Sequence, residues 1–278
     1  MDIKATDVKV LRDEVGAGFM DCKKALIEAN GDKQEAIRIL KKKGMAKAQK
    51  KSGRTASEGA VYAVISDNKQ EAAIVEVNCE TDFVARSDAF KAFVKAFATG
   101  AMEQKISTDT IESTTISGKS LEDARHAAVL NLGENIQVRR AQSLAASNDE
   151  AIYSYTHGDK ICVVLTLEKE DAALGKDIAM HVAALNPAAI TEDDIPAKIL
   201  NDERAIYEEQ LQGNNKPQEI NDKIITGKLK KFASGLCLYG QPFVKDPKET
   251  IHDLLKKSKN HVKKFIRFAL GDEISQSE

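Results

Sequence analysis

Asp82 and Phe83 stand side by side just after a short apolar run, residues 74–79, and just before an amphipathic segment. A strand that ends at Cys79 and a helix that starts behind the pair would place both residues on the connecting turn. An acid on such a turn commonly caps the following helix, and Phe is normally a core residue. The alternative is that both are exposed, with Asp82 as a free acid and Phe83 as an apolar wedge that enters a partner. Periodicity favours the cap and the core ring, and the choice between the two interpretations decides the function.

The other residue types that often carry catalysis are scattered. The chain has no G-x-x-x-x-G-K-S/T loop, and Gly16 and Gly18 follow a helical pattern and lack the third glycine of a dinucleotide fingerprint. His126 and His181 lie within helical patterns, where a satisfied histidine is the common case. Cys79 has no histidine nearby in the sequence, and the many carboxylates form no privileged acid–base pair. No catalytic or metal-ligating set emerges, so we expect neither enzymatic activity nor a metal site.

Length and composition bound the class of protein. At 278 residues the chain is long enough for two or three modest domains, and its net charge of −2 argues against a generally basic nucleic-acid binder. The four cysteines lie far apart, which predicts reduced, mostly buried thiols rather than a disulfide framework or a zinc ribbon. The N-terminus lacks an apolar signal segment, and no run approaches the length of a membrane span. We therefore expect a cytoplasmic protein without membrane contact.

The first fifty residues predict a bundle of three short helices. Apolar residues recur at helical spacing in three segments that are separated by glycine-containing turns. Asp32 and Glu35 resemble a capping box at the start of the third helix, and Gly44 is suited to end it. Residues 45–57 are rich in Lys and small residues and lack an apolar face, so they predict a mobile, partly helical linker.

Two related α+β units are predicted behind this linker. The first consists of a β-hairpin, two helices and a strand. The hairpin has strands at 61–65 and 72–77 and a turn at 67–69, and the helices lie at 90–97 and 121–132. Ser120 and Asp123 form a capping box before the second helix, and the strand starts at Ile136. The second repeats the order of hairpin and helix, at 152–156, 161–167 and 178–185. A shift of 88 residues places Asp82 and Phe83 on Glu170 and Asp171. The scaffold therefore does not need Phe at this point, which favours an added role for Phe83.

Residues 196–235 are strongly charged and helical on both sides of a polar turn at 213–217. They predict an antiparallel helical hairpin that projects from the body, followed by an irregular loop at 240–244. The predicted fold is α+β: an N-terminal three-helix bundle of the ubiquitin-associated kind, then two related α+β subdomains with antiparallel sheets and the projecting hairpin. The predicted domains are 1–54 for the bundle and linker, 55–143 for the first subdomain, and 144–278 for the second subdomain including the hairpin.

The run EVNCETDFVAR at residues 76–86 closely resembles a signature of the bacterial elongation factor Ts family. LRDEVGAGFMDCKKAL at residues 11–26 resembles that family's other signature, although Val15 stands where the family usually has Thr. Shorter matches follow in order, at 132–136, 155–158, 181–184 and 240–244. The resemblance covers essentially the whole chain. Some members carry an additional C-terminal helical module, and no contact of that module is expected here.

The resemblance implies a guanine-nucleotide exchange factor for elongation factor Tu, the GTPase that delivers aminoacyl-tRNA to the ribosome. In the family, the Asp-Phe pair intrudes near the partner's Mg²⁺ site. Asp82 and Phe83, flanked by Thr81 and Val84, are therefore expected to disturb the partner's Mg²⁺ and phosphate site and to promote GDP release, so that GTP can bind. Such a factor needs no cofactor of its own, because it acts on the nucleotide and Mg²⁺ of its partner.

Further contacts with the partner are implied by matching family positions. They are Leu11, Arg12, Phe19 and Met20 on the partner's nucleotide domain, Leu132 and Gly133 beside the wedge, and His157 and Val244 on the partner's other domains. Adjacent helical residues cannot both face one narrow core, so we expect one of Phe19 and Met20 to pack inward and the other to be exposed.

A second hypothesis is an RNA-associated translation protein that uses the Lys-rich stretch 41–51 and the charged hairpin. A solvated helix end and linker is the favoured interpretation of that stretch, so no direct nucleic-acid contact is expected. The sequence leaves open the affinity for the partner, the exchange rate, the source organism, and whether two copies associate in a 2:2 assembly with it.

Overall fold

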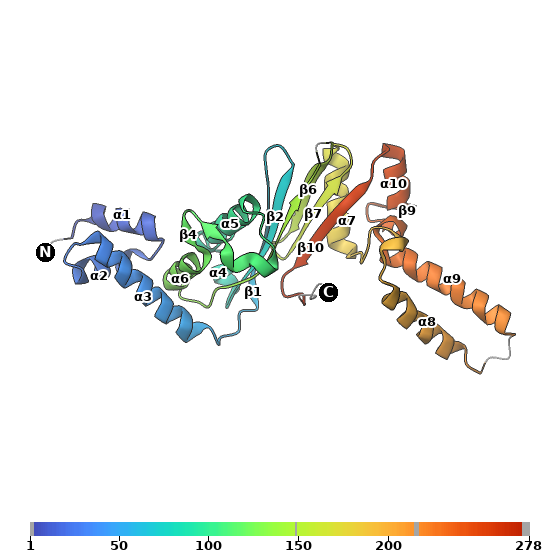
Figure 1. Cartoon of the computed structure of the whole chain (residues 1–278), viewed down its shortest axis with the longest axis horizontal. Coiled ribbons are helices and arrows are strands. Elements are labelled where there is room, and N and C mark those ends of the chain that lie inside the picture. Colours follow the sequence, from blue (N-terminus) through green and yellow to red (C-terminus); the bar gives the residue numbers. More distant parts are fainter. Residues whose placement is uncertain (1–2, 148, 214–216, 274–278) are drawn as a thin grey trace. The chain divides into compact units, whose positions relative to one another are not determined.

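Helices dominate the N-terminal part of the chain, and two small sheets with further helices follow. The structure is a computed structural model that describes residues 3–147, 149–213 and 217–273 (Figure 1). Its mixture of helices and small antiparallel sheets confirms the predicted α+β class. The chain divides into two units, one of Met1–Ala146, Thr156–Val164 and Phe268–Glu278, the other of Ser147–Tyr155 and Leu165–Arg267.

The N-terminal bundle consists of α1 (Ala5–Val15), α2 (Phe19–Glu28) and α3 (Lys33–Lys51). Gly16 adopts a φ of 79° after α1, and this left-handed conformation ends the helix as its glycine predicts. The Asp32 side chain accepts the Glu35 N–H at 3.0 Å, which confirms the predicted cap of α3. The bundle core is made of apolar residues from all three helices, among them Val8, Leu11, Cys22, Leu26, Ala36 and Leu40.

The third helix does not end at Gly44 but continues to Lys51, so residues 45–51 are not a linker. Gly44 faces α6 (Leu121–Leu132), and a Cβ placed on it would lie 3.0 Å from the backbone oxygen of His126. Ala48 is buried one turn later, in the core of the first sheet. Small residues thus let two helices approach closely, and this kind of contact surface shows no apolar stripe in the sequence.

The bundle and α6 share part of one core. Leu130 of α6 is buried among the bundle's apolar side chains, and Lys47 Nζ donates a hydrogen bond to the Leu130 carbonyl oxygen at 2.9 Å. Lys41 forms an ion pair with Asp123 at 2.8 Å near the start of α6. The bundle is therefore fastened along the length of α6.

The first sheet has the order β1-β2-β5, with β1 (Glu58–Ile65), β2 (Glu71–Cys79) and β5 (Gln137–Ala145) antiparallel. The predicted hairpin and helices are confirmed, including the Ser120 cap of α6. Phe90 and Phe97 of α5 (Asp88–Glu103) pack with Val75 and Val77 of β2 in one core. The shorter elements of this unit are α4 (Asp82–Arg86), η1 (Thr108–Ser113), β3 (Thr115–Ile116) and β4 (Lys119–Ser120).

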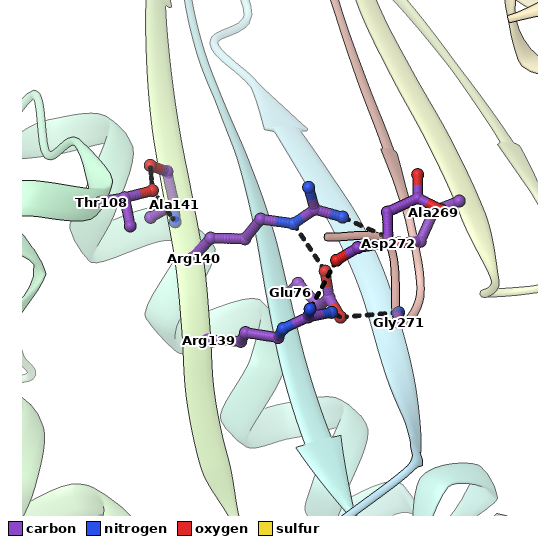
Figure 2. A network of polar contacts seen from close by, with 8 residues as sticks. All are labelled: Glu76, Thr108, Arg139, Arg140, Ala141, Ala269, Gly271 and Asp272. Carbon is purple, nitrogen blue, oxygen red and sulfur yellow. Dashed lines mark hydrogen bonds and ion pairs between the residues drawn. The ribbon is translucent and has the colours of Figure 1, made fainter. Parts of the chain in front are cut away.

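The face of β2 opposite to Val75 and Val77 carries a fully buried carboxylate, Glu76 (Figure 2). A β-bulge pairs Glu76 with Arg140 and Val77 with Val138, so that Arg139 is the extra residue of β5. Adjacent strand residues normally point to opposite faces, but here both arginines bind Glu76, Arg139 Nη1 at 2.8 Å and Arg140 Nε at 2.6 Å. The network leaves no charge on Glu76 uncompensated.

The same network holds the segment that follows β10 (Val262–Ala269) (Figure 2). The Gly271 N–H donates to Glu76 Oε1 at 3.0 Å, and Arg140 Nη2 donates to the Ala269 carbonyl oxygen at 2.8 Å. The Arg140 guanidinium also lies 4.0 Å from the centre of the Phe268 ring. One buried acid therefore connects β2, β5 and the end of β10.

The second sheet has the order β10-β7-β6, with β6 (Ala151–His157) and β7 (Ile161–Leu167) as the second predicted hairpin. The helix α7 (Ala172–Leu185) follows it. As in the first sheet, the second strand of the hairpin takes the central position, and a helix, α10 (Ile251–Ser258), precedes the third strand. The repeat predicted from the hairpin and helix thus extends to β10, which the sequence analysis did not predict.

The helices α8 (Ala197–Leu211) and α9 (Gln218–Leu236) form the predicted antiparallel hairpin (Figure 1). Part of its predicted turn, residues 214–216, lies outside the described residues. The segment expected to be an irregular loop includes a short strand, β8 (Pro242–Phe243), which pairs with β9 (Asp246–Thr250). The remaining elements are two 3-10 helices, η2 (Glu192–Asp194) and η3 (Leu238–Gly240).

The four cysteines are buried free thiols, as predicted. In the part of the chain that the structure describes, none of the helices has the length and apolar character needed to cross a membrane.

We predict that Glu76→Gln lowers the free energy of unfolding by about 3–5 kcal/mol, because the neutral amide leaves two arginines without their buried counter-charge. Urea denaturation of the whole chain measures this loss. Glu35→Gln is a suitable control, since its pair with Arg38 is exposed and should contribute no more than about 0.5 kcal/mol. If both variants lose the same small amount of stability, the buried network is not the support inferred from Figure 2.

Candidate functional site

The predicted turn after β2 is a short helix of its own, α4. Thr81 is its N-cap, and the Thr81 hydroxyl accepts the Val84 N–H at 3.3 Å. Ser87 ends α4 in an extended conformation and also caps α5, since its hydroxyl accepts the Phe90 N–H at 3.3 Å. In the second repeat four residues separate the end of β7 from the start of α7, which runs without such a break. In the first repeat, α4 is therefore a helical turn of its own, separate from α5.

Phe83 lies on this separate turn with 82% of its surface exposed. Its neighbours anchor the turn, because Ala85 is buried and Val84 packs against the core of the first sheet. The interpretation of Phe83 as a core ring is therefore wrong. The cap of α4 is Thr81 and not Asp82, because a side chain must precede the first helical residue to accept the free N–H groups.

Asp82 is the first residue of α4, where a negative charge is favoured by the helix dipole. Its carboxylate pairs with Arg86 one turn later, at 3.0 Å, and both side chains reach solvent. An exposed pair of this kind contributes little to stability. Asp82 is therefore free to exchange Arg86 for another cation or hydrogen-bond donor at small cost.

The loop before α4 is held by a carboxylate from another part of the chain, Glu134. Its Oε2 accepts the N–H groups of Glu80 and Thr81, both at 3.0 Å, and its Oε1 accepts the Thr81 hydroxyl at 2.6 Å. Hydrogen bonds to an ionised acceptor are worth roughly 1.5–3 kcal/mol each, about twice the value for neutral pairs. Glu134 follows Gly133, whose φ of 79° ends α6 and turns the chain toward Thr81.

Glu80 makes the reciprocal contact. Its Oε1 accepts the Asn135 N–H at 2.7 Å, and its Oε2 pairs with Arg54 at 3.3 Å. The Asn135 N–H, and secondarily Arg54, hold the pKa of the Glu80 carboxyl below its usual range. Asn135 in turn donates to the Arg54 carbonyl oxygen at 2.8 Å. Each of the loops at 80–81 and 134–135 thus supplies a carboxylate that binds the backbone of the other.

Cys79 sits beneath this loop and is buried. Burial raises the pKa of its thiol to about 12, and its Sγ lies 3.2 Å from the Thr81 carbonyl oxygen. A thiol with so high a pKa is protonated at neutral pH, whereas the thiolate is the nucleophilic form.

The bundle residues predicted to contact a partner divide into two kinds. Leu11 is fully buried in the bundle core, so it cannot form part of a docking surface as predicted. Arg12 is exposed beside Asp13. Phe19 and Met20 are 42% and 59% exposed, so the expectation that one of them packs inward is also wrong. The reason is that Gly18 is the N-cap of α2, so the pair forms the first two residues of this helix. The residues that α2 contributes to the bundle core start only at Cys22.

The exposed pair lies near the end of α6. A Cβ placed on Gly18 would lie 3.6 Å from Asn131 Oδ1. Leu132, the last residue of α6, packs on the core of the first sheet, and Gly133 follows it. Gly18, which directly precedes the exposed pair, and the predicted contact residues Leu132 and Gly133 therefore lie at the same helix end.

His157 and Val244 belong to the two different units. His157 is exposed at the first position of a tight turn in which Gly158 and Asp159 have φ values of 57° and 56°. Such a pair is typical of a type I′ hairpin. Val244 is 41% exposed, and its N–H donates to Nδ1 of the buried His181 at 3.2 Å.

His181 also places its Nε2 3.0 Å from Gln241 Oε1. Accepting a hydrogen bond at Nδ1 requires that nitrogen to be unprotonated, so the neutral ring with its proton on Nε2 fits both contacts. Burial lowers the pKa of His181 and so favours the neutral form. This histidine positions the Val244 loop and is not a metal ligand.

Within the described ranges, no cluster of three or more His, Cys, Asp or Glu side chains is arranged to hold a metal ion. Around α4 the described contacts are ion pairs, caps and backbone hydrogen bonds. Phe83 and the carboxylate of Asp82 both reach solvent on this anchored turn.

Comparison with known proteins identifies the family. Residues 80–272 match the family described as Elongation factor TS. The chain belongs to the elongation factor Ts family. It is 46% identical over 280 residues to Elongation factor Ts of Hydrogenovibrio crunogenus, across 100% of this chain and 95% of that relative. The chain is also 43% identical over 279 residues to Elongation factor Ts of Alkalilimnicola ehrlichii and 44% identical over 274 residues to that of Alcanivorax borkumensis, across at least 98% of this chain and 95% of each relative. The resemblance inferred from the two signatures is confirmed, and with it a role in translation elongation.

Glu80 and Glu134 were not predicted from the sequence as candidate site residues. Both lie within motifs that resemble the elongation factor Ts family, but a carboxylate that binds a distant backbone N–H leaves no periodic pattern. One signal could have indicated a role for Glu134. It directly follows Gly133, which ends α6, so its side chain does not belong to the helix and can bind another segment.

The Lys-rich stretch contributes to the fold. Lys41, Lys43 and Lys47 bind Asp123, Glu28 and the Leu130 carbonyl oxygen, respectively. These contacts account for three of the six lysines of the stretch, which help to fasten the bundle.

We predict that the folded protein loses stability as the pH falls below about 6.5, because unfolded chains take up a proton on His181 that the folded state disfavours. The loss continues until the pH reaches the lowered pKa, and above about 6.5 this group contributes no pH dependence. Urea midpoints at several pH values measure it. His181→Gln should remove this part of the pH dependence, and equal slopes for the two proteins would contradict the prediction.

Proposed function

We propose that this chain is a guanine-nucleotide exchange factor that binds elongation factor Tu and promotes release of GDP, so that GTP can bind during translation elongation. The observation that carries the proposal is the exposed Phe83 on a helical turn whose other side is anchored in the core. Membership of the elongation factor Ts family supports the choice of partner.

Phe83 and Asp82 provide two different means of disturbing a nucleotide site. Mg²⁺ demands near-ideal octahedral coordination, and in GTPases it bridges the nucleotide phosphates and protein oxygens. An apolar ring inserted beside such a site displaces ligands without replacing their hydrogen bonds. An exposed carboxylate that is only loosely paired with Arg86 can compete for the donors around the phosphates.

Exchange then follows from linkage between two binding events. If the factor and GDP oppose each other's binding, each weakens the other by the same factor. A coupling of roughly 4 kcal/mol changes affinity about a thousandfold. Burial of one Phe side chain supplies about 1.5–3 kcal/mol of this. The wedge alone is therefore insufficient, and Asp82 or the neighbouring contacts must supply the remainder.

The remaining surface of the proposed complex is formed by residues at matching family positions. The exposed ones are Arg12, Phe19, Met20, His157 and Val244. Val84, Leu132 and Gly133 are half-buried and add their accessible parts, with Thr81 beneath Phe83. In this proposal the protein works in the cytoplasm without a cofactor and without covalent chemistry of its own. The nucleotide and the Mg²⁺ both belong to the partner.

We predict that Phe83→Ala slows stimulated GDP release by about 10- to 100-fold, the rate equivalent of losing one buried ring. Asp82→Ala should slow it by about tenfold, a loss of roughly 1.4 kcal/mol. Stopped-flow release of fluorescent GDP from elongation factor Tu, at several factor concentrations, measures both effects. Ile206→Ala removes an apolar side chain that is 48% exposed on α8, outside the proposed contacts, and serves as the matched control.

If both site variants release GDP as fast as the parent, the wedge assignment is wrong. If the parent itself leaves GDP release unchanged, the exchange function is wrong for this chain.

A further inference from the structure

We propose that Glu134 is a positioning residue for exchange: through its bonds to the loop at 80–81 it holds the wedge in a fixed orientation relative to the bundle's exposed surface. This inference rests on the proposed function, since it assigns a role within that same site. Glu134 itself need not touch the partner. It acts through the backbone and side chain of Thr81, which starts the helix that carries Phe83.

The need for such a residue follows from the exposure of Phe83. A core side chain is held in place by its own packing, but a ring with 82% of its surface exposed contributes no such restraint. Its direction depends on how α4 begins and on the few anchoring side chains behind it. The turn has five residues, too few to be stable alone. An external restraint at its N-terminal end is therefore what can fix its orientation.

The Glu134 carboxylate provides that restraint at three points. It receives two consecutive backbone N–H groups and the Thr81 hydroxyl. Two backbone donors on one oxygen fix the peptide plane between Glu80 and Thr81, and the third bond fixes the cap side chain. The same Thr81 oxygen accepts the Val84 N–H, so the restraint passes directly into α4. The bond between Glu80 and the Asn135 N–H prevents the two loops from sliding past each other.

The other end of this connection is the bundle. Glu134 follows the last turn of α6, in which Leu130 is buried in the bundle core and its carbonyl oxygen is bound by Lys47. Gly18, directly before the exposed Phe19 and Met20, lies against Asn131 in the same turn. One helix end thus lies against Gly18, which precedes the surface proposed to dock, and leads into the residue that binds the loop proposed to act. A displacement of about 1 Å of a reacting group can lower a rate about a hundredfold. A change in the orientation between the two surfaces should therefore change the rate of GDP release measurably.

Binding of the partner and exchange of its nucleotide are expected to depend on different parts of the protein. The three hydrogen bonds described for Glu134 go to the loop at 80–81. Docking depends on exposed side chains of the bundle, whereas the displacement of GDP depends on the direction of Phe83. Loosening the loop should therefore lower the rate of GDP release at saturating factor by about tenfold or more, in line with the cost of a misplaced group. The factor concentration that gives half of the maximal rate should change much less.

The experiment compares the full-length parent with Glu134→Ala and Glu134→Gln. Glu134→Ala removes all three acceptor contacts. Glu134→Gln keeps one amide oxygen for the backbone N–H groups and should recover part of the rate. Glu122→Ala is the matched control, because it removes an exposed carboxylate from the other end of α6, where it binds Arg125 and His126. Stimulated release of fluorescent GDP is measured over a range of factor concentrations.

A second measurement tests the restraint without any partner. Amide hydrogen exchange of the free protein should show faster exchange at Glu80 and Thr81 in Glu134→Ala, with the amides of β2 and β5 unchanged. Unchanged exchange at these two amides would overturn the inference whatever the release assay shows. So would a maximal release rate equal to that of the parent, or a loss confined to the half-maximal concentration. If Glu134→Ala unfolds β2 and β5 as well, Glu134→Gln decides in the same way.

The two proposals fail in different ways. A parent that does not accelerate GDP release removes the exchange function, while faster amide exchange at Glu80 and Thr81 would still show that Glu134 holds the loop. A parent that accelerates release together with Glu134 variants that do so equally well removes only the positioning role.

Discussion

The buried carboxylate of Glu76 is the constraint on which the rest of the first unit depends. It lies in the middle of a strand that is buried on both faces, where an unpaired charge would cost several kcal/mol. It is compensated by two adjacent arginines of β5, which a bulge brings to the same carboxylate, and by a backbone N–H from the segment behind β10. The strand that leads to the candidate site is thus held by residues from three distant parts of the sequence.

The candidate site combines rigid support with an exposed side chain. Apolar packing cannot hold a ring that faces water, so the loop beside Phe83 is held by charged hydrogen bonds. Such bonds are directional, and they remain effective at a partly exposed position where a hydrophobic contact would be lost. The small residues Gly44 and Ala48 serve the same purpose, because they allow the bundle to approach α6 and the first sheet closely.

Elements with a local signal could be predicted from the sequence. The helix predicted at 121–132 has the bounds of α6, and both hairpins and the helical pair α8 and α9 were predicted, because periodicity and turn residues act within a few positions. The continuation of α3 beyond Gly44 could not, since its contact with α6 depends on the absence of a side chain. The strand β10 was also missed: Phe265 and Ile266 interrupt its alternation, and its partner β7 lies far away in the sequence.

The sequence by itself determined the family, the repeated α+β organisation and the position of the Asp-Phe pair on a turn after a strand. It also showed, through the repeat, that the fold does not require an aromatic residue there. Only the tertiary structure decided that Phe83 is exposed while Leu11 is buried, that Arg139 and Arg140 share one face, and that Glu134 binds the loop at Thr81. The physical reason is that exposure and hydrogen bonding depend on neighbours that are distant in sequence, whereas periodicity reports only on the residue's own element.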